Sequence, residues 1–113
     1  MKDRTEKAWK KLRYLELSKS ATREEIAQAL REIGEAALLE VDVYSALAVF
    51  ERLGSREGLS KAVELGLRER CDLSATFVAA RILGGEDKLE QIIRWACDEK
   101  QEDVIDDVLQ KTL

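Results

Sequence analysis

The sequence predicts a single all-α domain, and three observations lead to that prediction. The 113 residues include no proline, the residue that breaks helix interiors. Ala, Leu, Glu, Arg, Lys and Gln are abundant, and these are good helix formers. No stretch alternates apolar and polar residues for long enough to indicate a half-buried strand. A chain of this length is the usual size of one domain and can bury a core of its own.

Seven helices are predicted from apolar spacing, capping residues and glycines. Thr22 and Glu25 have the spacing of a capping box, in which each side chain bonds a free backbone N–H group. Asp42 and Asp72 are suitable N-caps for the third and fifth helices. Gly54 is placed to end the third helix. The expected ranges are 3–18, 23–39, 43–53, 56–69, 73–83, 87–99 and 102–112.

The distribution of apolar residues predicts which helix faces are buried. Residues 43–50 are nearly all apolar, so the third helix is expected at the centre of the fold. Gly66 lies inside the fourth helix, where glycine costs roughly 1 kcal/mol relative to alanine, and is expected to mark a close helix crossing. Cys97 lies beside Trp95 and is expected in the core. The stripes predicted for the last two helices are Leu89, Ile92, Ile93, Ala96, Val104, Ile105, Val108 and Leu109.

Two segments of the chain share a pattern with a period of thirty residues. Laying residues 42–71 over residues 72–101 aligns a capping aspartate, a glycine and a series of apolar positions. The aligned pairs include Asp42–Asp72, Val43–Leu73, Leu47–Phe77, Leu53–Leu83, Gly54–Gly84, Leu59–Leu89, Val63–Ile93 and Leu65–Trp95. A matched cap, glycine and apolar register at a fixed period indicate two helix–turn–helix repeats.

This pattern resembles the α-α repeat proteins, the broad group that includes HEAT-like and tetratricopeptide repeats. The resemblance covers residues 40–112 and rests on pattern, because the Trp, Gly, Tyr and Pro signature of tetratricopeptide repeats is missing. It implies a short stack of antiparallel helix pairs, and it implies partner binding. A compact helical bundle with two similar hairpins is the alternative. The expected organisation is an N-terminal helix pair (1–41), two repeats (42–71 and 72–101) and a closing helix (102–113).

Composition excludes most catalytic and metal-binding chemistry. The chain has no histidine and only two cysteines, so neither a Ser-His-Asp triad nor a Cys/His zinc site can form. Neither of the common glycine-rich phosphate loops is present. The acids of the last helix are interpreted as a solvated face rather than a magnesium site. They are Glu102, Asp103, Asp106 and Asp107. The sequence therefore predicts no enzyme activity, no metal and no cofactor.

Charge is distributed unevenly along the chain. Residues 1–23 contain eight lysines and arginines against three acidic residues, whereas residues 86–113 contain four against nine. A basic helix can contact an acidic protein surface or a phosphate backbone. Tyr14 falls outside the apolar stripe of its helix and is expected on the surface, while the spacing of Trp9 also suits the core. The predicted partner-binding residues are Lys7, Trp9, Lys10, Lys11, Arg13 and Tyr14.

These observations predict a non-catalytic protein-interaction module that acts as an adaptor, a chaperone-like factor or an assembly subunit. Its expected partner is another protein or a second copy of itself, bound through a helical groove or face. The alternative is a small nucleic-acid-associated protein that uses residues 2–23. The N-terminus lacks the apolar segment of a signal peptide, and no apolar run is long enough to span a membrane. A cytoplasmic location and no membrane contact are therefore expected.

Overall fold

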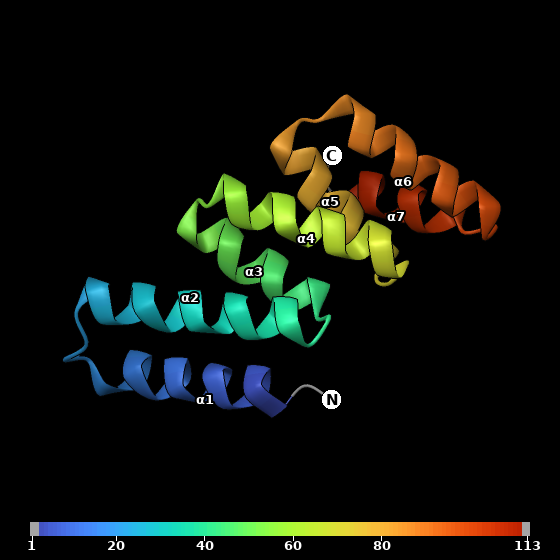
Figure 1. Cartoon of the computed structure of the whole chain (residues 1–113). Helices are drawn as coiled ribbons and strands as arrows, with labels where there is room; N and C mark the ends of the chain where they lie inside the picture. Colours follow the sequence, from blue (N-terminus) through green and yellow to red (C-terminus); the bar gives the residue numbers. More distant parts are fainter. Residues whose placement is uncertain (1–2, 112–113) are drawn as a thin grey trace.

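The computed structural model describes residues 3–111, which form seven α-helices and no strand (Figure 1). The helices are α1 (Asp3–Ser18), α2 (Arg23–Leu39), α3 (Val43–Leu53), α4 (Arg56–Glu69), α5 (Leu73–Leu83), α6 (Glu86–Asp98) and α7 (Glu102–Lys111). The predicted all-α class is confirmed. The predicted boundaries agree except that α6 lies one residue earlier, and the predicted end of the last helix, residue 112, falls outside the described residues.

The helices are stacked in chain order. Each one packs mainly against the next helix and, from α2 to α7, against the helix after that. Figure 1 shows α1 and α2 at one end of the stack and α6 and α7 at the other. The molecule measures 47 × 30 × 22 Å, and its radius of gyration of 14.9 Å exceeds the about 13 Å of a compact domain of this length. The stack is therefore elongated, with two end faces.

The caps that the sequence predicts are present. The side chain of Thr22 accepts a hydrogen bond from the backbone N–H of Glu25 (3.1 Å), and the Glu25 carboxylate accepts one from the N–H of Thr22 (3.0 Å). Asp42 and Asp72 accept from N–H groups in the first turns of α3 and α5. Satisfying these free donors fixes where each helix begins.

The core lies along α3 and α5, as the apolar run in residues 43–50 predicts. The ring of Phe50 is held between α2 and α4 at two glycines. A Cβ atom on Gly34 would lie 2.5 Å from the ring, and one on Gly58 would lie 2.2 Å from it. Only the absence of a side chain at both positions lets α2 and α4 close around this ring.

The predicted close crossing at Gly66 is also confirmed. A Cβ atom there would lie 1.9 Å from the hydroxyl oxygen of Thr76 on α5. That hydroxyl is buried and donates a hydrogen bond to the backbone carbonyl of Asp72 (2.9 Å). Gly66 therefore allows α4 and α5 to approach more closely than any larger residue would.

Three residues expected inside are exposed, which corrects the predicted stripes of α6 and α7. Ile93 is 46% exposed, Leu109 is 36% exposed and Cys97 is on the surface. Ile93 and Cys97 each follow a buried residue, Ile92 and Ala96, by one position, which turns them about 100° around the helix. Within the described residues no helix covers that side of α6.

Candidate functional site

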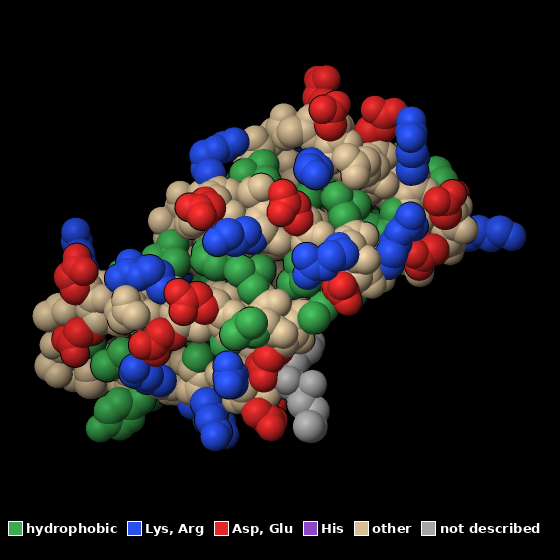
Figure 2. Space-filling view, viewed as in Figure 1, with side chains coloured by type: hydrophobic (Ala, Val, Ile, Leu, Met, Phe, Trp, Pro, Cys, Tyr) green, Lys and Arg blue, Asp and Glu red, His purple; other side chains and the backbone are tan. Residues whose placement is uncertain are grey.

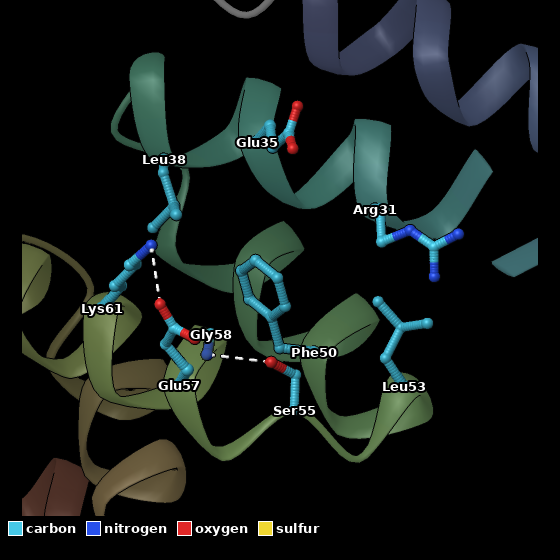
Figure 3. A pocket seen from close by; sticks show the side chains of 9 residues that line it. All are labelled: Arg31, Glu35, Leu38, Phe50, Leu53, Ser55, Glu57, Gly58 and Lys61. Carbon is cyan, nitrogen blue, oxygen red and sulfur yellow. Dashed lines mark hydrogen bonds and ion pairs between the residues drawn. The ribbon is translucent and has the colours of Figure 1, made fainter. Parts of the chain in front are cut away.

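A groove of about 390 Å³ opens between α2 and α4 (Figure 3). It separates the N-terminal helix pair from the first predicted repeat, and three elements contribute to it: α2, the end of α3 and the start of α4. The residues that line it are Arg31, Glu35, Leu38, Phe50, Leu53, Ser55, Glu57, Gly58 and Lys61.

The floor of the groove is apolar. Phe50 lies at its centre between the ribbons of α2 and α4, as Figure 3 shows, and its ring is fixed by the glycine contacts described above. Leu38 and Leu53 are half-buried on either side and pack against the core. Excluding water from apolar surface of this kind favours the binding of a ligand.

The rim of the groove carries both signs of charge. Arg31 and Glu35 lie on α2, and Glu57 and Lys61 lie on α4 near Leu38. Lys61 and Glu57 form an ion pair on one helix turn, with 3.4 Å between Nζ and Oε1. Both side chains are exposed, so this pair contributes little stability and can exchange its partner for a ligand charge.

The groove continues along the same face of the molecule. A hollow of about 200 Å³ shares Leu38 and Lys61 with it and extends toward Arg68. Another, of about 240 Å³, lies between α4 and α6 over Trp95. Figure 2 shows hydrophobic side chains gathered between these helices, with charged side chains of both signs around them. The face formed by α2, α4 and α6 thus has a series of shallow hollows that are lined by both apolar and charged side chains.

The basic helix α1 presents five of its six predicted binding residues to solvent. They are Lys7, Lys10, Lys11, Arg13 and Tyr14, and Tyr14 is 75% exposed. Trp9 is the exception, because it is half-buried and its indole N–H donates to the Ser45 hydroxyl on α3 (3.1 Å). Trp9 is thus partly packed against α3.

The basic surface of α1 is partly neutralised by neighbouring acids. Lys11 pairs with Glu32 of α2 (3.1 Å), and Glu16 pairs with Arg52 of α3 (3.8 Å). The basic residues left without an ion pair to any described side chain include Lys7, Lys10 and Arg13. Lys2, which the sequence also assigns to this surface, falls outside the described residues.

One carboxylate has a shifted pKa, and it stabilises a helix end. Glu40 follows α2 and accepts hydrogen bonds from the Thr5 hydroxyl (2.7 Å) and from the backbone N–H groups of Thr5 (2.8 Å) and Arg4 (3.1 Å). The bond from the Thr5 hydroxyl is the main reason why the pKa of Glu40 lies below its ordinary value. Glu40 therefore caps the start of α1 from another helix.

The described residues offer little catalytic or metal-binding chemistry. No three acidic or cysteine side chains among residues 3–111 are grouped so that they could hold a metal ion. In the same range, every buried side-chain nitrogen and oxygen has a hydrogen-bond partner. The four acids of α7 are exposed.

The sequence predicts partner binding through a helical groove or face, but it does not predict which residues line this groove. Its lining comes from α2, α3 and α4, and no local motif links them. The one available signal is the combination of Phe50 with two glycines inside flanking helices, Gly34 and Gly58, since an interior glycine often marks a close contact.

None of the helices in residues 3–111 combines the length and apolar character that crossing a membrane requires. The chain matches no protein-family model, and comparison with curated proteins and with solved structures found no significant match.

Proposed function

We propose that this chain is a non-catalytic protein-interaction module that binds a helical segment of a partner protein in the groove between α2 and α4. The observation that carries this proposal is the groove itself, with an apolar floor around Phe50 and a rim of mixed charge. The role would be that of an adaptor, a chaperone-like factor or an assembly subunit.

The groove has the chemistry of a helix-binding surface. An amphipathic helix presents apolar side chains at positions i, i+3 and i+4, which can enter a narrow apolar groove in series. Each fully buried Leu or Phe contributes about 1.5–3 kcal/mol. Rim charges such as Glu35 and Lys61 would then select the orientation of the partner by charge complementarity.

The α-α repeat interpretation is part of this proposal. It is supported by the bounds of α3 and α5, which coincide when the chain is shifted by thirty residues, as do the starts of α4 and α6. Stacks of such pairs create long faces for extended or helical partners. The cytoplasm is the compartment that we propose, because the two cysteines form no disulfide with each other.

Binding of nucleic acid through α1 is the second candidate. It is favoured by Lys7, Lys10 and Arg13, which are exposed and lack an ion pair to any side chain of residues 3–111. Against it stand the acids Glu6 and Glu16 on the same helix and the net charge of −4. Such binding would weaken steeply as salt is raised.

The test is an affinity capture from an extract of the source cells, with and without nuclease, followed by binding measurements with the purified captured protein. We expect a protein that survives nuclease and that loses affinity when Leu38→Gln alters the groove floor. Ile82→Gln is the matched control, because Ile82 is an exposed apolar residue on α5. Equal binding by both variants would contradict the groove proposal.

The same experiment addresses nucleic acid. If recovery disappears with nuclease, and if replacing Lys7, Lys10 and Lys11 by glutamine abolishes it, the second candidate replaces the first. Affinity unchanged by those three substitutions would exclude the α1 surface as a phosphate-binding site.

A further inference from the structure

The N-terminal end of the stack exposes apolar side chains beside basic ones. Tyr14 is 75% exposed and Leu17 is 74% exposed, and they lie one helix turn apart on the same face of α1. Lys7 and Lys10 precede Tyr14 by seven and four residues, which places them on that face as well. Figure 2 shows hydrophobic side chains projecting from the edge formed by α1. This surface, α1 residues 7–17, is called the head below.

The C-terminal end exposes apolar side chains on α6 and acidic side chains on the neighbouring α7. Ile93 and Cys97 lie one turn apart on α6, and both are exposed. On α7, which packs against α6, Glu102, Asp103 and Asp106 are exposed and form no ion pair with another described residue. This surface, formed by Ile93, Cys97 and the acids of α7, is called the tail below.

The exposed apolar positions of the tail correspond to positions that are covered elsewhere in the fold. Thirty residues earlier, Val63 and Leu67 occupy the equivalent positions on α4, where they are 1% exposed and half-buried respectively. The same register on α6 is bare because no further helix of the described chain packs there. Exposed apolar positions on the end of a helix stack need covering by a cap or a partner.

We propose that the head of one copy packs on the tail of a second copy. Charge complementarity carries this inference: α1 contains five basic and three acidic residues, whereas α7 contains four acidic and one basic. Tyr14 and Leu17 would cover Ile93, while the unpaired lysines and arginine of the head would face the unpaired acids of the tail.

This arrangement joins two different surfaces, so it leaves one free head and one free tail on every dimer. Such a contact adds further copies until the chain of molecules closes into a ring or forms an open filament. The groove between α2 and α4 lies between the two ends and takes no part in the contact. An assembly would therefore present several grooves in a row and raise the avidity for a partner with repeated binding segments.

Sedimentation velocity over a range of protein concentrations tests the proposal. We expect the wild-type chain to self-associate at low salt, with the dissociation constant rising about tenfold or more between about 0.05 M and about 0.5 M salt. A head variant (Lys7→Glu, Lys10→Glu, Arg13→Glu) and a tail variant (Glu102→Lys, Asp103→Lys, Asp106→Lys) should each be monomeric under the low-salt conditions. Circular dichroism verifies that both remain helical.

Mixing the variants gives the sharpest result. The intact tail of the head variant should bind the intact head of the tail variant. The acidic head and the basic tail that remain free are also complementary, so the mixture should self-associate although each variant alone is monomeric. A chain that carries all six substitutions should self-associate again. A groove variant, Leu38→Gln, should associate like the wild type, so a failure of the proposed groove is distinguishable from a failure of this contact.

Three results would overturn the inference. The first is a wild-type chain that is monomeric at every concentration and salt. The second is a tail variant that associates as the wild type does, because that outcome indicates a two-fold contact between heads. The third is a head that binds a nucleic-acid duplex while showing no affinity for the tail of another copy.

Discussion

The two helix pairs α3–α4 and α5–α6 repeat each other in local structure but differ in what surrounds them. Their first helices coincide at both ends after a shift of thirty residues, each begins at an aspartate cap and each ends at a glycine with positive φ. Those glycines are Gly54 (φ 65°) and Gly84 (φ 79°), and a left-handed conformation costs glycine nothing. Local sequence therefore determines the helices and turns of both pairs.

Burial follows the neighbours rather than the local pattern. The first pair has helices on both sides, α2 before it and α5 after it, whereas α6 of the second pair has one uncovered side. An apolar residue at one register position is consequently core in α4 and surface in α6. The same apolar register is therefore covered in α4 and exposed in α6.

The largest expected effect tests this contrast directly. Val63→Asp places an unpaired charge in the core and should reduce the free energy of unfolding by about 4 kcal/mol. Ile93→Asp, at the equivalent position of α6, should change it by less than about 0.5 kcal/mol in the monomer. Urea denaturation of dilute protein measures both.

If Val63→Asp does not fold, Val63→Ala supplies the comparison, with an expected loss on the order of 2 kcal/mol. Equal losses at the two positions would mean that Ile93 is as buried as Val63, and the tail surface would not exist.

The second effect concerns the crossing of α4 and α5. Gly66→Ala places a methyl group against Thr76, and overpacking of this kind should cost about 2–3 kcal/mol even after the better helix propensity of alanine. The equivalent position on α6 is already alanine, Ala96, so Ala96→Gly should cost only about 1 kcal/mol. Thermal unfolding ranks the two variants, and a stabilised Gly66→Ala would contradict the close approach.

Local features were predictable from the sequence because they depend on residues close together in the chain. Each of three local features follows from the residue type at one position. Threonine and aspartate side chains accept hydrogen bonds at helix starts, as Thr22 does. Glycine is small enough for a close helix crossing, as at Gly66. Helix boundaries follow from these caps and from the spacing of apolar residues, so most of them agree to the residue.

Features that depend on distant neighbours were predicted less well. Ile93 and Cys97 continue an apolar stripe, but which part of a wide stripe is covered depends on where α7 packs. Trp9 has the spacing of a core residue and the chemistry of a binding residue, and its hydrogen bond to Ser45, far away in the sequence, could not be read from the local pattern. The groove forms where the Phe50 ring packs between α2 and α4, and this packing depends on residues that are distant in the sequence.

A smaller expected effect on stability concerns the residues with positive φ in the turns between helix pairs. Between pairs, the left-handed position after α2 is Val41 (φ 57°), and after α6 it is Lys100 (φ 55°). A β-branched residue is strained there by about 1–2 kcal/mol, so Val41→Gly should stabilise the fold by about 0.5–1 kcal/mol after the entropy cost of glycine. Lys100→Gly should give a smaller gain. Chemical denaturation detects the difference, and destabilisation by Val41→Gly would show that its partly buried side chain outweighs the strain.

The smallest expected effect on stability concerns the residue that directly follows α2, Glu40, and its equivalent after α4. Glu40 caps α1, whereas the equivalent Arg70 lies near Asp98 and Glu99 instead. Because folding lowers the pKa of Glu40 below its ordinary value of 4.5, the ionised carboxylate stabilises the fold above that pH, and this contribution disappears as the pH falls through the lowered pKa. Glu40→Gln should therefore be less stable than the wild type at pH 7, and the difference should shrink as the pH falls below 4.5. Thermal melts across this range measure the gap between the two proteins, and a gap that widens toward acid would mean that the charge of Glu40 opposes folding.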